Sequence, residues 1–270
     1  MPISSCDENR LRLAQEAESK FAQARQLVKS GDFAGALECY LFAFDNSLAV
    51  SGWGGVRLSY IPSEIAQLGN KYPPAKEALQ VRRNAREEMI RAGETDFNLV
   101  SEWTSLNGYL CENDRELALL EEMEKRGNLD ESVKDRIIDS NFDRLLSEKR
   151  YDILSGYLDD FGNQFMMQIF HYEEAALFPE RFERAPGGDY WKSHIRDSGA
   201  KVFELALGVR KELQADGIAT RILLYCTDAE TYNKLINAAL RAGHKKKARE
   251  LAKHAKANLD REEYDKVKKF

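Results

Sequence analysis

The chain contains 270 residues, of which 43% are hydrophobic and 31% are charged, and its formal net charge is −5 at pH 7. This composition supports a sizeable core, and six prolines leave little room for long disordered segments. No run approaches the roughly 18 consecutive apolar residues of a membrane span, and residues 1–12 lack the apolar stretch of a secretory signal. We therefore expect a globular cytoplasmic protein without a membrane partner.

Residues 17–48 predict a helical hairpin. Gly31-Asp32 marks a turn between two stretches in which apolar residues recur at spacings of three and four, the period of an α-helix. The first stripe contains Phe21, Ala24, Leu27 and Val28, and the second contains Ala36, Leu37, Tyr40 and Ala43. A hairpin of this size cannot bury both stripes alone, so it needs neighbours of the same shape. Ala36 and Ala43 are expected at buried helix crossings, where small side chains let two backbones approach.

Residues 51–55 form a glycine-rich stretch that contains Trp53. Their spacing matches neither phosphate-binding glycine motif, and no strand is predicted before them. We interpret the stretch as a connector whose Trp53 packs on a helix, with a ligand-contacting loop as the alternative.

The middle of the chain continues as helices. They are predicted over residues 56–67, with Pro62 as a kink or restart, and over 74–92, 96–111, 114–126, 131–148 and 151–161. Residues 161–177 then carry methionines and aromatic residues at helical spacing. Such a stripe is typical of a core, and a contact surface for a partner helix or peptide is the alternative.

The strongest breaks in the chain are Phe178-Pro179 and residues 185–189, so a boundary between two sub-arrays is expected near 179–189 if one exists. A long helix is predicted from Tyr190 toward Gln214, with Gly217 separating it from a shorter helix. The run 222–226 is the only stretch that could pass for a buried strand, and it has no partner strand, so strands are expected to be absent. A last hairpin, with Asp228 as its N-cap, covers residues 228–259, and a short helix follows from Arg261.

Two parts of the sequence resemble tetratricopeptide repeats. Ala36, Tyr40 and Ala43 after Gly31-Asp32 match the second half of such a repeat. Near the C-terminus, Tyr232, Leu235, Ile236 and Ala239 follow the first half, and Gly243, Ala248 and Ala255 recur at the spacing of the first copy. Leu48 and Asp260 replace the usual proline and Ile236 the usual glycine, so the repeats are degenerate. Two segments also resemble uncharacterised bacterial helical-repeat proteins: Gly55-Val56-Arg57-Leu58-Ser59 and Tyr72-Pro73-Pro74-Ala75.

The resemblance implies an all-α fold, a right-handed α–α superhelix in which residues 1–270 form a single array of roughly six or seven helix pairs. In proteins of this kind the first helix of each pair lines a concave surface that holds a protein or peptide. The polar positions of those helices are then the candidate partner-binding residues: Gln23, Gln26, Asn107, Asn233 and Asn237.

No catalytic, cofactor-binding or metal-binding residues can be nominated from the sequence. Cys6, Cys39, Cys111 and Cys226 are scattered, without the spacing of a zinc or redox motif. His171 and Glu174 lie one helical turn apart, but two ligands are too few for a metal site. An enzyme whose site is assembled from distant helices stays open as an alternative.

The C-terminal 30 residues are basic, with eleven Lys and Arg against five Asp and Glu. Four of these residues form a basic stripe on one helix face: Lys246, Arg249, Lys253 and Lys256. We interpret the stripe as the solvated outer face of a terminal repeat. An anionic ligand or nucleic acid is the alternative, although nucleic acid is disfavoured because no recognised binding motif accompanies the stripe.

These observations predict a non-catalytic protein-interaction scaffold or adaptor that binds a protein or peptide segment. The sequence does not identify the partner or the oligomeric state.

Overall fold

A computed structural model describes residues 5–178, 180 and 188–268 of the chain. Within these residues the secondary structure is helical and contains no strand, which confirms the expected all-α class. The chain forms two compact units, Met1–Ser140 and Asn141–Phe270. None of the described helices is long and apolar enough to cross a membrane.

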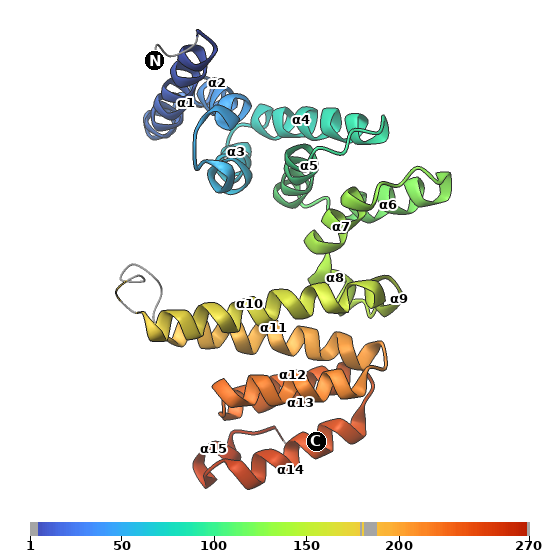
Figure 1. Cartoon of the computed structure of the whole chain (residues 1–270). Coiled ribbons are helices and arrows are strands. Elements are labelled where there is room, and N and C mark those ends of the chain that lie inside the picture. The colour runs from blue at the N-terminus through green and yellow to red at the C-terminus, as the bar shows by residue number, and fades with distance from the viewer. Residues whose placement is uncertain (1–4, 179, 181–187, 269–270) are drawn as a thin grey trace. The chain divides into compact units, whose positions relative to one another are not determined.

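The first unit is a series of helices in which neighbours in sequence pack together (Figure 1). Its elements are α1 (Ser5–Ser30), α2 (Phe33–Asn46), a 3-10 turn η1 (Ser47–Ala49), a π-helical turn η2 (Val56–Tyr60), α3 (Ile61–Gly69), α4 (Pro74–Arg91), α5 (Phe97–Leu110), α6 (Asp114–Arg126) and α7 (Glu131–Ser140). Pro62 stands in the first turn of α3, directly after the π-helical turn η2, and the backbone stays helical through both, so the helix does not restart there.

The α1–α2 hairpin confirms the predicted packing. Gly31 has a φ of +86°, a conformation that favours glycine, and the Asp32 carboxylate accepts a hydrogen bond from the Gly35 N–H at 3.0 Å to cap α2. Ala36 and Ala43 have no exposed surface. The expectation for Trp53 is also confirmed, since its ring packs edge-on against that of Phe21, with ring centroids 5.6 Å apart.

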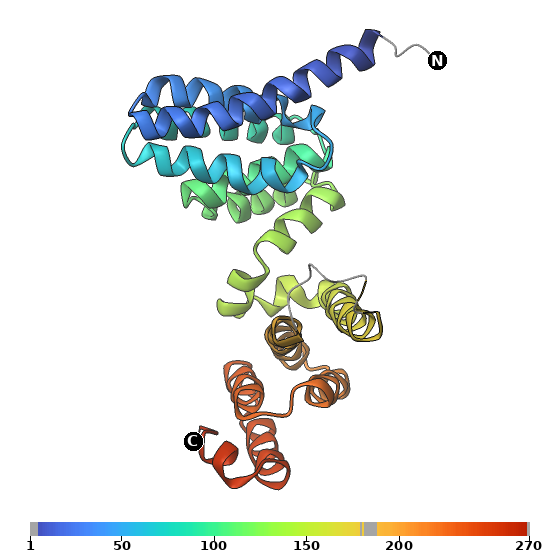
Figure 2. The same ribbon diagram turned by 90° about the vertical axis from the view of Figure 1, so that its left-hand side faces the viewer.

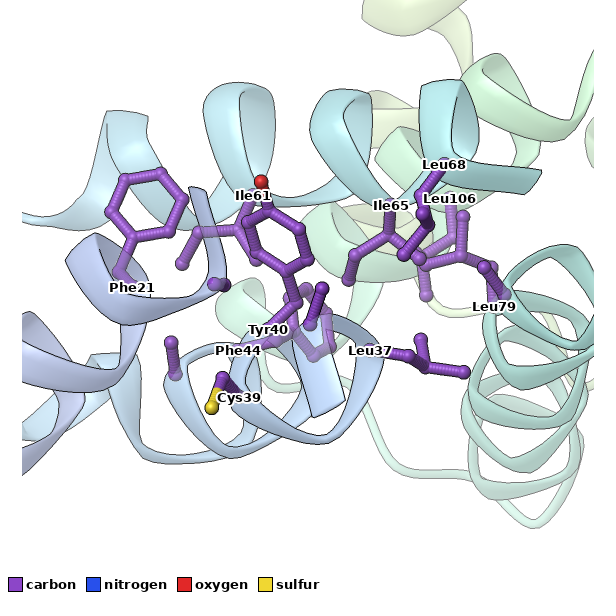
Figure 3. Packing of buried hydrophobic residues seen from close by; sticks show 14 of the residues in the cluster. Phe21, Leu37, Cys39, Tyr40, Phe44, Ile61, Ile65, Leu68, Leu79 and Leu106 are labelled. Carbon is purple, nitrogen blue, oxygen red and sulfur yellow. The ribbon is translucent and has the colours of Figure 1, made fainter. Parts of the chain in front are cut away.

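A hydrophobic core joins α1 to α5. Figure 3 shows Leu37, Tyr40 and Phe44 of α2 meeting Ile61 and Ile65 of α3. The same cluster includes Leu79 of α4 and Leu106 of α5. The hairpin therefore buries its stripes against its neighbours, as its size requires.

The second unit also consists of helices that stack beside one another (Figure 1). Its elements are α8 (Phe142–Ser147), α9 (Tyr151–Leu154), a 3-10 turn η3 (Ser155–Tyr157), α10 (Leu158–Leu177), α11 (Gly188–Gly208), α12 (Glu212–Tyr225), α13 (Ala229–Arg241), α14 (Lys245–Asn258) and α15 (Arg261–Asp265). Helix α11 packs against α10, α12 and α13, and α13 packs against α14. Figure 2 shows several of these helices nearly end-on. In this view α10 and α12 lie on the right, and α11 and α13 lie to the left of them.

The predicted boundary between α11 and α12 is wrong. The long helix ends at Gly208 instead of continuing toward Gln214, and Gly217 lies inside α12. The chain turns at Arg210, which has a φ of +61°, and the Lys211 N–H donates to the Ala206 carbonyl at 2.8 Å, as in a Schellman motif. An arginine thus takes the left-handed position that glycine usually marks in a sequence.

The possible break near 179–189 falls mostly outside the described residues. Helices α10 and α11, which lie on either side of it, pack against each other within the second unit.

The expected N-cap of α13 is confirmed, since the Asp228 carboxylate accepts a hydrogen bond from the Thr231 N–H at 2.8 Å.

Helix α10 divides the Met- and aromatic-rich stripe between two faces. Phe161, Phe165 and Ile169 are buried, whereas Met167 and Phe170 are about half exposed, at 51% and 53%. The segment is therefore core on one face and open surface on the other.

Candidate functional site

Two adjoining grooves flank α12 in the second unit. The first, of about 670 Å³, lies between α12 and α14, and its lining includes Thr220, Leu224, Leu251 and His254. The second, of about 600 Å³, lies between α10 and α12, and its lining includes Gly162, Phe165, Met166 and Ile218. Both volumes are in the range of ligand-binding clefts. Gly217 and Arg221 line both grooves, so this part of α12 is the ridge between them. We call the pair the α12 grooves.

The ridge is a consequence of the sequence of α12. Ala215, Ile218, Ala219 and Ile222 recur at helical spacing and are buried. The rest of the helix surface is open and partly apolar, because Leu213 is 89% exposed and Leu224 is 72% exposed. Of these two, Leu224 lines the first groove, and an exposed apolar side chain at a groove can serve as a contact for a partner.

Gly217 lowers the ridge, and no packing contact with the described residues requires a glycine there. A Cβ atom added to Gly199 of α11 would lie 2.6 Å from Ile222 Cγ1, so that glycine is required by close packing. A Cβ added to Gly217 would meet nothing within 4 Å, and the same is true of Gly162 on the facing edge of the second groove. A glycine inside a helix costs roughly 0.5–1 kcal/mol relative to alanine. Gly162 and Gly217 therefore lower helix stability, and no contact within the described residues compensates for it.

The charges of the α12 grooves are mostly paired. The Lys247 ammonium lies 2.7 Å from Asp216 and 2.9 Å from Glu250. Burial opposes the charge of Lys247, but hydrogen bonds to these two carboxylates outweigh it, so its pKa is raised. Asp159 accepts a hydrogen bond from Gln214 Nε2 at 3.1 Å.

Arg221 differs from these residues. It is exposed at the ridge and forms no hydrogen bond or ion pair with any of the described residues, although its charge acts on Tyr225 one turn later. Arg221 thus places a positive charge on the ridge, without a carboxylate partner among the described residues. His254, at the rim of the first groove, has its Nδ1 2.7 Å from the Tyr232 hydroxyl.

The five predicted partner-binding residues do not come together. Gln23 and Gln26 are exposed on α1 in the first unit. Asn107 is fully buried in α5, where its side-chain oxygen accepts from Arg83 Nη1 at 3.0 Å, so it cannot contact a partner. The Asn233 side chain on α13 donates a hydrogen bond to the Lys266 carbonyl and accepts one from the Lys268 N–H. It therefore fixes the backbone that follows α15. Asn237 is half-buried on α13, and none of the five lines the α12 grooves.

The predicted basic stripe lies on the exposed side of α14. Lys246 is 94% exposed and 4.0 Å from Glu250, and Arg249, Lys253 and Lys256 are exposed as well. The groove is lined by different residues of the same helix, among them Lys247, Leu251 and His254, which are spaced by four and three. The four residues of the stripe are thus exposed, and a different face of α14 borders the first groove.

A polar layer between α4 and α5 is the main feature that sequence reasoning missed. Glu102 is buried and pairs with Arg57 of η2 and with Arg86 Nη2 at 3.0 Å. Glu87 is also buried and pairs with Arg91 and Arg115. The spacing of the residues does not predict the polar layer. Charged residues occur on both the buried and the exposed face of α4, so the sequence does not distinguish those that lie inside.

The carboxylates of the polar layer are paired, although Arg57 Nε is buried without a hydrogen-bond partner among the described residues. Burial opposes the charge of Glu87, but hydrogen bonds from Arg91, Arg115 and Trp103 outweigh it and lower its pKa. Burial lowers the pKa of Arg57 despite its partner Glu102. Glu87 and Glu102 thus each meet two guanidinium groups, as in a structural ion-pair network.

The described residues contain no group of three or more His, Cys, Asp or Glu side chains that could hold a metal ion. His171 is exposed and lies near the rings of Phe170 and Trp191, at centroid distances of 6.1 and 6.2 Å. Cys39 and Cys226 are buried free thiols, and Cys111 is an exposed one.

Comparisons with models of known protein families, with curated proteins and with solved structures find no match for this chain. Any assignment of function therefore depends on the residues described above.

Proposed function

We propose that this protein is a non-catalytic interaction scaffold or adaptor, and that the α12 grooves of its second unit hold a segment of a partner protein. The observation that carries the proposal is the pair of adjoining open grooves, which share Gly217 and Arg221. Two grooves joined over a low ridge suit a continuous chain that passes from one to the other.

The surface chemistry supports a protein partner. Leu224 and Met166 offer apolar contacts on the two sides of the ridge, and in the first groove Lys247 is held by ion pairs to Asp216 and Glu250. Protein interfaces commonly combine an apolar centre with a polar rim.

The proposal includes a tetratricopeptide-like arrangement of helix pairs and a cytoplasmic location. Ala36 and Ala43 at the α1–α2 contact and Ala248 and Ala255 on α14 are fully buried small residues, as interlocking helix pairs require. A right-handed superhelix would follow if successive pairs in each unit stack with the same small rotation.

Site-specific photo-crosslinking tests the location of the partner. A benzophenone amino acid is placed at Thr220 in the first groove, at Asn237 on α13, or at Lys256 in the basic stripe, and each protein is irradiated in an extract of cells that produce it. We expect a discrete protein adduct at Thr220 and none at Lys256. Equal adducts at all three positions, or none at Thr220, would contradict the proposal, and an adduct at Lys256 alone would favour an anionic partner.

A further inference from the structure

We infer that the partner segment crosses α12 in extended conformation at Gly217, places an acidic side chain beside Arg221, and fills the groove on each side with an apolar side chain. This inference rests on the proposed function and adds the chemistry of the occupant.

The crossing point follows from the two open glycines. A side chain at Gly217 would stand on the ridge between the grooves, in space that no described atom of the chain occupies within 4 Å. Gly162 leaves similar space at the α10 edge of the second groove. Glycines of this kind permit the close approach of another backbone. We call this low part of the ridge, at Gly217 and Arg221, the saddle. An extended main chain fits it, because an extended chain is thinner than a helix with its side chains.

The acidic side chain follows from the charges. Lys247 already has two carboxylate partners, and the Asp159 carboxylate accepts a hydrogen bond from Gln214. Arg221 has no such partner among the described residues and lies at the ridge between the grooves. A carboxylate that reaches its guanidinium can form two parallel charge-assisted hydrogen bonds.

The position of the acid within the segment follows from the two grooves. Arg221 lines both of them, so a chain that crosses the saddle continues on each side of it. Leu224 and Leu251 offer an apolar contact on one side, and Met166 and Ile218 on the other. Directly packed helices are roughly 8–10 Å apart, and neither α10 nor α14 packs closely on α12, so at about 3.3 Å per residue a crossing from α10 to α14 takes at least about five or six residues. The acid is therefore internal, with apolar residues both before and after it.

Selection from a phage-displayed library of random dodecapeptides tests the inference on the full-length chain. Enriched sequences are synthesised with a fluorescent label and amidated C-termini, and their affinities are measured by fluorescence anisotropy. We expect an enriched pattern of one Asp or Glu flanked by apolar residues. Replacing that acid by Gln or Asn should weaken binding about tenfold or more, the effect of losing a charge-assisted hydrogen bond.

Three substitutions connect binding to the saddle. Gly217→Trp should abolish measurable binding, while Gly217→Ala should raise the melting temperature, because an added methyl group fills open space on a helix. Gly162→Trp is a second blocking variant, on a different helix, and applies if Gly217→Trp does not fold. Arg221→Glu should weaken binding of the acidic peptide and restore binding of the same peptide carrying Lys in place of the acid.

The outcomes separate this inference from the proposed function. Peptides that are blocked by the Trp variants but carry no acid, or that need a free C-terminal carboxylate instead, would overturn the inference and leave the grooves as a binding site. Peptides that bind equally well to both Trp variants, or the absence of any enriched peptide, would overturn both.

Discussion

Small side chains set the distance between α1 and α2. Ala24 on α1 and Ala36 and Ala43 on α2 have no exposed surface, and the aromatic rings of Phe21 and Tyr40 lie beside them. Interiors are packed as densely as organic crystals, so an added isobutyl group at such a crossing has to displace its neighbours.

Ala36→Leu should therefore destabilise the first unit by about 1–3 kcal/mol, the range observed for overpacked cores. Urea denaturation followed by circular dichroism measures the change. Ala34→Leu is the matched control, because Ala34 is exposed on the same helix and its substitution should be worth less than about 0.5 kcal/mol. Equal stability of the two variants would contradict the packing described here.

Glu102 is the residue on which the polar layer depends most. Its side chain is 5% exposed and that of its partner Arg57 is 6% exposed. Glu102→Gln should destabilise the first unit by about 3 kcal/mol or more, because it leaves a buried guanidinium without its counter-charge. Glu131→Gln removes an exposed ion pair with Lys134 and should change the free energy of unfolding by less than about 1 kcal/mol. A loss for Glu102→Gln no larger than that of the control would show that the buried pair contributes nothing.

At the scale of elements, the polar layer makes the contact of α4 with α5 and α6 sensitive to acid. Hydrogen bonds from Arg91 and Arg115 lower the pKa of Glu87 against the effect of burial, a hydrogen bond from Arg83 lowers that of Glu112, and one from Arg91 lowers that of Glu122. A carboxylate whose pKa is lower in the folded state stabilises the fold above its unfolded pKa, about 4.3 for Glu. That contribution is lost as the pH falls through the folded pKa.

The melting temperature of the first unit should therefore stay level from pH 7 to about 5 and fall progressively below about pH 4.3. Thermal unfolding at a series of pH values measures it. The triple variant with Gln at positions 87, 112 and 122 should have a lower melting temperature at pH 7. Its melting temperature should also depend less on pH. A melting temperature of the natural chain that rises as the pH falls from 5 to 3 would contradict the sign of these shifts.

The basic stripe of α14 should be dispensable. Lys246, Arg249, Lys253 and Lys256 are exposed, and replacing all four by Gln should leave the fold and the groove intact, at less than about 0.5 kcal/mol per residue. Gel-shift titration with a random DNA duplex at low salt tests this prediction. Micromolar binding by the natural chain that is lost in the variant would instead identify the stripe as an anion-binding surface.

Helical periodicity predicted the fold class and most elements, because it reports which face of a helix is buried. The boundary at Arg210 was missed, since an arginine in the left-handed region has no sequence signature. The polar layer was missed because buried and exposed arginines of α4 look alike. The α12 grooves were missed for a different reason: they depend on where α10 and α14 lie relative to α12, which no single stretch of sequence encodes. Gly217 was the one available signal, and it was interpreted as a helix break.

At the scale of the molecule, the two compact units have separate cores. Ala36 is buried in the first, and Leu205 of α11 is fully buried in the second. Scanning calorimetry should show two transitions, with Ala36→Leu lowering one and Leu205→Ala lowering the other, the latter by about 2–5 kcal/mol. A single transition shifted by both substitutions would show that the units unfold together.

The open glycine of α12 also has an evolutionary consequence. Alanine at position 217 would stabilise the helix, and the described residues leave room for it. Selection removes mainly those substitutions that bring a protein below the stability it needs. A residue that lowers stability can therefore be retained where activity requires it. Among descendants of this chain that still bind the partner, we expect position 217 to stay glycine. In lineages that have lost the partner, it should drift to alanine before the core residues of α12 change.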